Sequence, residues 1–199
     1  AVGIKQIFGF FFLVREIIYF SISRDPKERP KPPPPIATIF LLGILINHLF
    51  MNLRQITVKD QLELKKVYFD SIQSLDEKIY SKKQKMAWSS QAWKNPYFDK
   101  SIIEGKGWLL NEQGIIIAFA TRFPLNRISL FYCRGNFQRK GYGSILLHKL
   151  EDEARKDGLD SLSTEASLIS YELFLKNEWE IIRKEKVTIN NIFFERYKM

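Results

Sequence analysis

The residues with the clearest chemical potential lie in one segment, 133–144 (CRGNFQRKGYGS). It places two cations, Arg139 and Lys140, beside Gly141 and Gly143, and it runs directly into an amphipathic stretch. The first N–H groups of a helix lack intrahelical partners, and together with the helix dipole they attract anions. Glycines let the backbone approach phosphate oxygens, and two cations suit a pyrophosphate better than a single carboxylate. The segment therefore predicts a pyrophosphate site, with a basic helix cap as the alternative.

Two other kinds of phosphate loop, and metal chemistry, are excluded by the residue types. The dinucleotide fingerprint requires a third glycine where Leu146 stands, and no GxxxxGK[ST] pattern occurs. Cys133 is the single cysteine, so there is no disulfide framework and no multi-cysteine metal site. His48 and His148 lack the spacing of metal ligands. We therefore expect no metal and a reducing, cytoplasmic location.

Composition places the chain among folded globular proteins. Its 199 residues are 45% hydrophobic and 14% aromatic, which indicates one ordinary domain plus an extension. The formal net charge of +9 suits either nucleic acid or an anionic small ligand. The cations are spread along the chain and no aromatic–basic RNA motif occurs, so no nucleic-acid partner is expected.

The first 50 residues differ in composition from the rest. They hold six of the eight prolines, between two apolar stretches at 7–22 and 36–51. Each stretch is shorter than the roughly 20 apolar residues of a membrane span. Two interpretations remain open: residues 1–50 are a hairpin-like membrane anchor, or they are upstream sequence joined to a protein that begins at Met51. Membrane contact is expected only under the first, and residues 51–199 form the domain proper.

Hydrophobic periodicity predicts a mixed α/β (α+β) domain from residue 51 onward. Alternating patterns predict strands and helical spacing predicts amphipathic helices, while capping boxes open at Asp60 and Ser81 and Gly158 ends a helix. Trp93–Asp99 is expected to be a loop because it contains Pro96. The strands expected are 53–58, 108–110, 115–121, 127–133, 159–166, 179–187 and 192–197, and the helices 60–72, 81–88, 142–157 and 168–176.

One family resemblance rests on these residues. Gln138-x-x-Gly141-x-Gly143, between the strand 128–133 and Ser144-Ile-Leu-Leu, resembles the acetyl-CoA loop of the GNAT superfamily of N-acetyltransferases. The stretches 150–158 and 162–167 continue the pattern, and the ending resembles the YafP-like bacterial branch. The resemblance covers residues 52–198. It implies a mostly antiparallel sheet of about seven strands flanked by about four helices.

The resemblance also implies where acetyl-CoA would bind as a co-substrate. Its pantetheine arm would pair with the strand 131–133 in a gap beside the strand ending near Ala166, and its pyrophosphate would sit on the amides of 139–144. A backbone amide near Cys133 would polarise the thioester carbonyl. The implied cofactor-binding residues are Phe131, Tyr132, Cys133, Gln138, Arg139, Lys140, Gly141, Tyr142, Gly143, Ser144 and Ser167.

The implied reaction is direct attack by a primary amine of a small molecule or peptide on the acetyl carbonyl. The sequence departs from the family where the usual acid, a tyrosine, is replaced by Phe174 and a common asparagine by Ser167. The remaining catalytic candidates are Tyr132, Glu165 and Tyr171. An acyl-CoA-binding module with weak turnover is the alternative, and a homodimer is compatible with either.

Further positions have a bearing on the site. Cys133 has no evident partner base, so we expect it to pack in the core rather than carry an acyl group. Trp88, Tyr80 and Glu77 fall in the helix–loop–helix region that forms one wall of the acceptor site in this family. The Gly-Phe pair usual after the last helix is Glu178-Trp179, and Gly135 stands where a proline is expected.

Overall fold

The computed structural model describes residues 51–199. Both interpretations of residues 1–50 fall outside this range. Among the described residues, no helix is long and apolar enough to cross a membrane.

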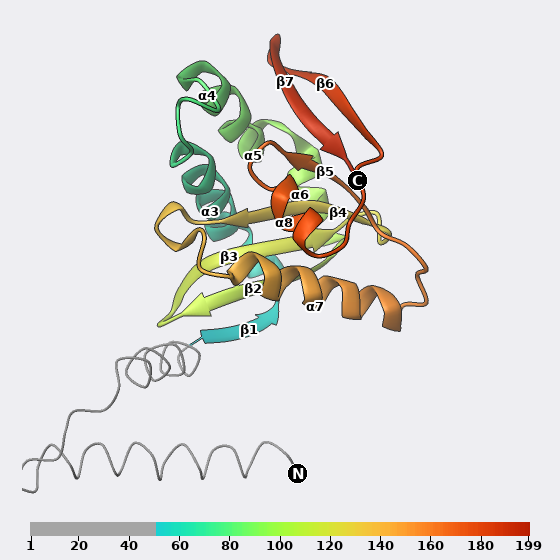
Figure 1. The fold of residues 1–199 in the computed structure, drawn as a ribbon. Helices are drawn as coiled ribbons and strands as arrows, with labels where there is room; N and C mark the ends of the chain where they lie inside the picture. Colours follow the sequence, from blue (N-terminus) through green and yellow to red (C-terminus); the bar gives the residue numbers. More distant parts are fainter. Residues whose placement is uncertain (1–50) are drawn as a thin grey trace, which may run out of the picture. The chain divides into compact units, whose positions relative to one another are not determined.

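The centre of the domain is one seven-stranded sheet (Figure 1). Its spatial order is β1-β2-β3-β4-β5-β7-β6, and all neighbouring strands are antiparallel except β4 and β5. The mixed, mostly antiparallel sheet of about seven strands is therefore confirmed. The strands are β1 (Met51–Gln55), β2 (Lys106–Glu112), β3 (Ile115–Arg122), β4 (Arg127–Cys133), β5 (Ser163–Ser167), β6 (Arg183–Ile189) and β7 (Ile192–Lys198).

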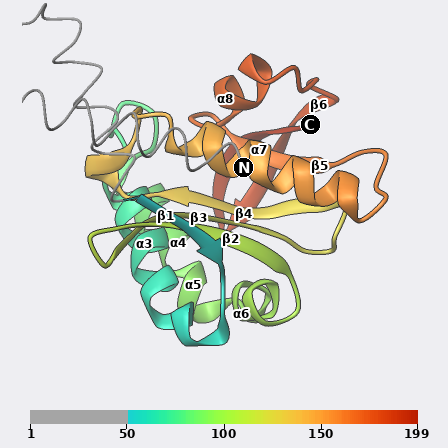
Figure 2. The same cartoon turned by 90° about the horizontal axis from the view of Figure 1, so that it is seen from below.

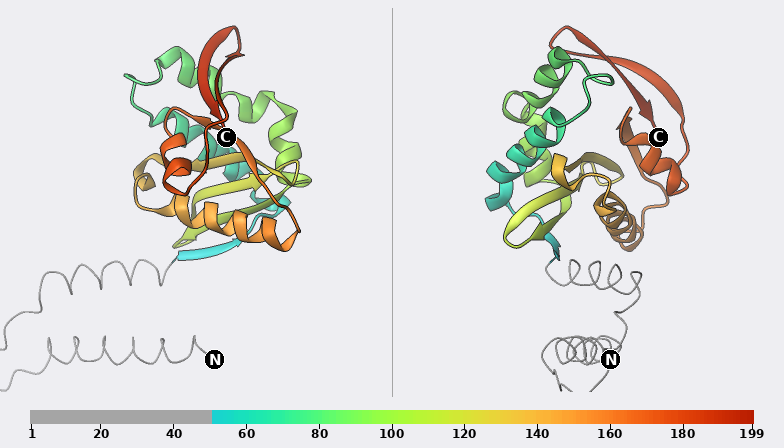
Figure 3. Two further views of the ribbon diagram at one scale, coloured as in Figure 1. Left: turned by 45° about the vertical axis from the view of Figure 1, so that its right-hand side comes forward. Right: turned by 60° about the vertical axis from the view of Figure 1, so that its left-hand side comes forward.

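Helices cover both faces of the sheet. Two of them lie on one face and four on the other, as the view from below shows (Figure 2). The first group is α7 (Tyr142–Lys156) and α8 (Tyr171–Lys176). The second group is α3 (Gln61–Gln73), α4 (Lys82–Ser89), α5 (Gln91–Lys94) and α6 (Pro96–Ile103). The hairpin of β6 and β7, red in Figure 3, lies beside α4. Phe194 of β7 packs there in a cluster with Ala87 and Trp88 of α4.

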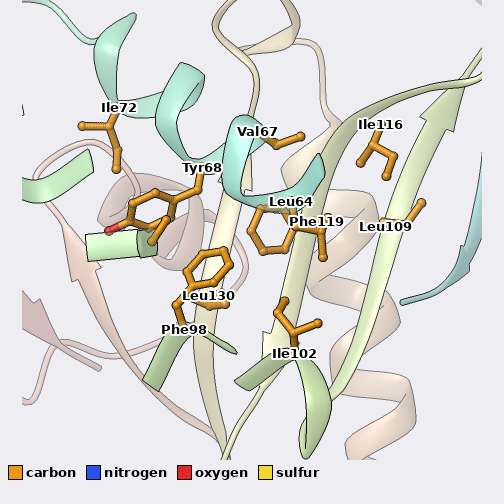
Figure 4. Packing of buried hydrophobic residues seen from close by; sticks show 11 residues of the cluster. Leu64, Val67, Tyr68, Ile72, Phe98, Ile102, Leu109, Ile116, Phe119 and Leu130 are labelled. Carbon is orange, nitrogen blue, oxygen red and sulfur yellow. The ribbon is translucent and has the colours of Figure 1, made fainter. Parts of the chain in front are cut away.

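The core has one cluster on each face of the sheet. On the α3 face, Leu64 and Tyr68 pack toward Leu109 and Phe119 (Figure 4). On the α7 face, a second cluster joins the helix to the same central strands. Strand β3 is buried along nearly its whole length, as its long apolar run predicts. Both faces of the strands that border the site are thus held by packed helices.

Several local signals are confirmed. The Ser81 N–H donates to Gln84 Oε1 at 2.9 Å, which is the capping box expected at the start of α4. Gly158 has a φ of +75° just beyond α7, and its N–H bonds the last turn of that helix. Asn190 and Asn191 both have positive φ in the β6–β7 turn.

The loop expected at Trp93–Asp99 is wrong, because α5 and α6 occupy it. Asn95 accepts from the Tyr97 N–H at 3.0 Å, and Pro96 is the first residue of α6. Proline is favoured at that position, because its φ is already helical and its missing N–H is not needed there. Pro96 therefore begins a helix rather than interrupting one.

Element ends differ from the sequence expectations by up to four residues. Strand β1 ends at Gln55 rather than residue 58, because Asp60 accepts hydrogen bonds from the Thr57 N–H and hydroxyl and turns the chain. Strand β5 begins at Ser163, β6 at Arg183 and α8 at Tyr171, each later than expected.

Candidate functional site

Strands β4 and β5 separate from one another, and this separation creates the site. They pair at only two positions, Arg127↔Ser163 and Ile128↔Thr164. Beyond these two positions β5 pairs only with β7, which lies on its other edge, from Glu165 onward. A cleft opens where β4 continues without a β5 partner among the described residues. This is the gap that the resemblance implies.

The cleft reaches both faces of the sheet, so it has two halves. The α7 half is lined by Phe131, Cys133, Arg139, Tyr142, Gly143 and Leu146, with Leu173 and Phe174 of α8. The α3 half is lined by Ser71, Ile72, Leu75, Trp88, Tyr132, Glu165 and Ile169. A ligand lying in one half therefore reaches the other through the gap between the strands.

Backbone geometry shapes the α7 half. Gly141 caps α7 with a φ of +88°, a conformation that L-residues rarely adopt, and no atom lies within 4 Å of where its Cβ would be. At Gly143 a Cβ would lie 2.6 Å from Leu173 Cδ1. The first glycine leaves open space before the helix amides, and the second lets α7 and α8 approach closely.

The charges expected at this helix end are exposed. Arg139 Nη2 lies 3.7 Å from Glu172 Oε2, and the Lys140 ammonium lies 5.2 Å from the centre of the Phe137 ring. Exposed ion pairs of this kind contribute little stability, so both side chains are free to turn toward an anion. The N-terminus of α7 adds the partial positive charge of its dipole.

Gln138 braces the loop. Its Nε2 donates to the carbonyl oxygens of Cys133 at 3.1 Å and of Ser71 at 3.3 Å. The loop is thereby tied both to β4 and to α3. The side chain that begins the sequence motif thus contacts the protein's own backbone in this structure.

The segment before the loop is also held by α3. Asp70 Oδ2 accepts from the Gly135 N–H at 3.0 Å. A Cβ on Gly135 would lie 2.3 Å from the Cβ of Ser74, so no side chain fits there. Where a proline is expected from the resemblance, this chain needs a glycine because α3 lies against it. The next contact, from Arg134 Nη2 to Glu63 Oε1 at 2.5 Å, adds a salt bridge to the same helix.

Tyr132 lies among aromatic residues in the α3 half. Its ring centroid is 4.4 Å from that of Tyr68 and 6.4 Å from that of Trp88. Burial raises the pKa of Tyr132 to about 12 and holds that of Tyr68 well above its usual value. The Tyr68 hydroxyl donates to the Trp88 carbonyl at 3.0 Å. Both phenols are therefore neutral near pH 7, so Tyr132 can donate a hydrogen bond but cannot act as a base.

Glu165 is fixed by an arginine on the neighbouring strand. Arg127 Nε donates to Glu165 Oε2 at 2.7 Å, and Nη2 contacts the same oxygen. Arg127 Nη1 donates to the Tyr97 hydroxyl at 2.7 Å, and that hydroxyl donates to the Phe123 carbonyl at 2.6 Å. Within residues 51–199, Glu165 Oε1 has no hydrogen-bond partner. A carboxylate oxygen is therefore held in place at the cleft and left open to a ligand.

Comparison with known families and structures agrees with this geometry. The model of the acetyltransferase (GNAT) family matches residues 69–176, more than half of the chain. The chain belongs to the GNAT family. It is therefore an acyltransferase. No curated protein is significantly similar to it in sequence.

Solved structures share the GNAT fold. A GCN5-related N-acetyltransferase from Rhodopseudomonas palustris superposes with a TM-score of 0.70 at 24% identity, covering 74% of this chain and 92% of that one. PaiA N-acetyltransferase from Thermoplasma acidophilum, in complex with coenzyme A, has a TM-score of 0.55 at 15% identity, over 74% and 97%. YncA from Salmonella typhimurium, with its cofactor acetyl-CoA, has a TM-score of 0.53 at 16% identity, covering 75% of this chain and 92% of that one.

At the position that the resemblance assigns to the usual tyrosine, this chain has a buried phenyl ring. Phe174 is only 1% exposed, and its ring lies 5.4 Å from that of Phe131 and 5.0 Å from that of Trp179. Tyr171 stacks on Tyr197 at 4.6 Å and does not line the cleft. The structure thus brings Tyr132 and Glu165 to the GNAT cleft and turns Tyr171 elsewhere.

Serines and a tyrosine shape the turn before α8. Ser167 Oγ accepts from the Ser170 N–H at 3.1 Å, so it is engaged within its own turn. The Tyr80 hydroxyl accepts from the Leu168 N–H at 3.0 Å, and burial raises the pKa of Tyr80.

Burial also raises the pKa of the Cys133 thiol to about 12, which keeps it neutral. A neutral thiol agrees with the packing role expected for Cys133.

Sequence reasoning missed several cleft residues. Ser71, Ser129, Thr164 and Ser170 all line it. They stand in no common motif and come from separate elements, so only pairing of β4 with β5 and packing of α3 bring them together. The one signal in the sequence was Ser71, a polar residue on the helix face that is otherwise apolar and buried.

Proposed function

We propose that this protein is an acetyl-CoA-dependent N-acetyltransferase acting on a primary amine of a small molecule or peptide. The observation that carries the proposal is the cleft between the separated β4 and β5, which leads from the N-terminus of α7 to the carboxylate of Glu165. PaiA and yncA, which share the fold, have coenzyme A and acetyl-CoA bound respectively. Acetyl-CoA is the co-substrate.

The residues of the α7 half fit that co-substrate. Open space lies before Gly141 at the start of a helix of 15 residues, and Arg139 and Lys140 are exposed beside it. These groups suit a pyrophosphate. Past Ile128 the edge of β4 has no β5 partner within the described chain, so its N–H and C=O groups can pair with an extended amide arm.

The α3 half supplies the groups that act on the acceptor. Acetyl-CoA contributes an acetyl group as a thioester, whose C–S bond breaks as the amine forms a C–N bond and CoA leaves as a thiol. Glu165 Oε1 takes one proton from the acceptor ammonium, directly or through one water, while Arg127 keeps the other oxygen in place. The second proton that the nitrogen loses on forming the amide goes to the departing thiolate. The neutral Tyr132 hydroxyl donates a hydrogen bond in the same half.

The second candidate function is a GNAT-fold module that binds acyl-CoA with weak turnover. One feature favours it: the resemblance aligns Phe174 with the usual acid, and its phenyl ring, which is buried, has no proton to donate. The two candidates differ in one result, since only an enzyme releases CoA when an amine is added.

The remaining expectations are proposals of the same kind. Residues 51–199 are the catalytic unit, and residues 1–50 precede it. The protein works in the cytoplasm without a nucleic-acid partner, and its ending resembles the YafP-like branch. A homodimer is compatible with this assignment.

The test compares thermal unfolding of the full chain with and without acetyl-CoA. A ligand that binds only the folded state raises the midpoint temperature of unfolding. At a hundredfold excess over its Kd, such a ligand stabilises the folded state by about 2.7 kcal/mol. Gly141→Val should abolish the rise. Gly158→Val is the matched control, because Gly158 also has a positive φ and open space around its Cβ position. No rise in the unmodified protein would overturn the co-substrate assignment.

A further inference from the structure

We propose that the acceptor is a monoamine carried on a flat apolar group, such as an arylalkylamine. This inference rests on the proposed function, because it specifies the acceptor in the α3 half of the cleft. Three features carry it: the apolar lining, the balance of charge and the rigidity of the wall.

The lining of the α3 half is apolar opposite Glu165. Ile72 lies in the last turn of α3 and Leu75 just beyond it, Trp88 lies on α4 and Ile169 precedes α8. Trp88 and Leu75 are half-buried, so their side chains present surface to the cleft. Removing apolar surface from water is favourable, which favours an acceptor that covers these residues. An aromatic ring meets that requirement, because it can lie against the Trp88 indole.

The charge in the cleft has room for one ammonium. Among residues 51–199, Glu165 is the single acidic side chain that lines the cleft, and Arg127 already neutralises part of its charge. Arg139 is the one cation among the described residues that line the cleft, and it lies in the α7 half. Lys85, next to the wall, is only 7% exposed and lies 3.4 Å from Glu77. A polyamine would place its second and third charges against apolar or cationic groups. Such unpaired charges are costly to bury.

The wall is rigid before any acceptor arrives. Lys85 Nζ donates to the carbonyl oxygens of Gln73 at 3.2 Å and Leu75 at 3.0 Å, which holds the end of α3. The Tyr68 hydroxyl donates a hydrogen bond to the Trp88 carbonyl, and the Tyr80 hydroxyl accepts one from the Leu168 N–H. A pre-formed site loses little freedom on binding, so its shape selects among acceptors.

The experiment measures CoA release by the full chain with three amines in the presence of acetyl-CoA. 2-Phenylethylamine is the apolar monoamine, ethanolamine the polar monoamine and spermidine the polyamine. We expect kcat/KM for 2-phenylethylamine to exceed the other two by about tenfold or more, as apolar pockets discriminate. Equal or higher kcat/KM for ethanolamine or spermidine would overturn the inference while leaving the N-acetyltransferase intact. Release with none of the three, and no thermal shift with acetyl-CoA, would overturn the proposed function as well.

Variants of the wall test the same inference from inside the chain. Trp88→Leu should lower kcat/KM for 2-phenylethylamine by about tenfold and change the value for ethanolamine by less than about twofold. Trp88 packs in two clusters, so Leu75→Gln is a second variant with the same expected contrast. Ile103→Gln is the control, since Ile103 is 55% exposed on α6 and does not line the cleft. Equal losses for both amines would contradict a role of the wall in acceptor choice.

Discussion

The two halves of the cleft differ in the kind of group that would contact the ligand. In the α7 half these groups are backbone amides, placed by two glycines within three consecutive residues. In the α3 half they are side chains from α3, α4, β4, β5 and the turn before α8. Backbone contacts depend on chain geometry and therefore leave a short sequence motif. Side-chain contacts depend on packing and leave none.

The comparison predicts that turnover and co-substrate binding can be separated. Glu165→Gln removes the carboxylate of the α3 half and leaves the loop intact. We expect kcat to fall by about 10²- to 10³-fold, the usual contribution of general base catalysis. The thermal shift caused by acetyl-CoA should stay unchanged. The measurement is CoA release alongside thermal unfolding.

Glu153→Gln is the control for this substitution. Glu153 lies on α7, paired with Lys149 at 2.8 Å and Lys156 at 2.9 Å, outside the cleft. Its kcat should remain within about twofold, as for ordinary surface substitutions. If Glu165→Gln behaved like this control, Glu165 would not be the base.

The next prediction concerns the contact between the segment before the loop and the end of α3. Gly135→Ala should destabilise the protein by about 1–3 kcal/mol, because the new Cβ would lie 2.3 Å from the Ser74 Cβ, too close for two carbon atoms without a shift. Ser74→Gly in the same chain should restore most of that loss by removing the atom it meets. Denaturant unfolding of the single and double variants measures both. An additive double variant would mean that the two residues do not meet.

A smaller effect is expected at alkaline pH, from the phenols of the α3 half. Tyr132 has a pKa of about 12 in the folded protein against a usual value of 10.0. Folding therefore favours the protonated form, and its contribution to stability is constant below pH 10 and is lost as pH rises toward 12. Tyr132→Phe should flatten that decline. Thermal unfolding between these pH values measures it, and an unchanged slope would contradict burial of this phenol.

The smallest effect is expected at Gln138, which braces the loop. Gln138→Ala removes two hydrogen bonds to backbone carbonyls, each worth about 0.5–1.5 kcal/mol. We expect acetyl-CoA to bind several-fold more weakly, with kcat little changed. Titration of the thermal shift gives the affinity. A fall in kcat with unchanged affinity would place Gln138 with the α3 half instead.

The fold was largely predictable where a signal is local. The capping box at Ser81–Gln84, the turn at Asn190–Asn191 and the buried run of β3 each depend on neighbouring residues, and each is confirmed. The loop expected at Trp93–Asp99 failed because Pro96 both breaks and begins helices. Packing of Phe98 against Tyr68 at 5.2 Å helps hold the helix that forms there.

The candidate site was predictable in one half only. The segment from Gly141 to Ser144 could be located because its chemistry follows from consecutive residues. The partner of Glu165 could not, because Arg127 lies 38 positions earlier and meets it only when β4 and β5 pair. The orientation of Tyr171 toward Tyr197 depends likewise on how β7 packs beside β5 and α8.

The sequence by itself determined the helix end that can hold an anion, because its glycines and cations act within one turn of the chain. It also determined the order of the strands and of the helices other than α5 and α6, through hydrophobic periods of two and 3.6 residues. Only the tertiary structure decided that β4 and β5 part after two residue pairs and that Glu165 keeps one oxygen open. The physical reason is distance along the chain: contacts between remote segments depend on how whole elements pack, and no local pattern encodes them.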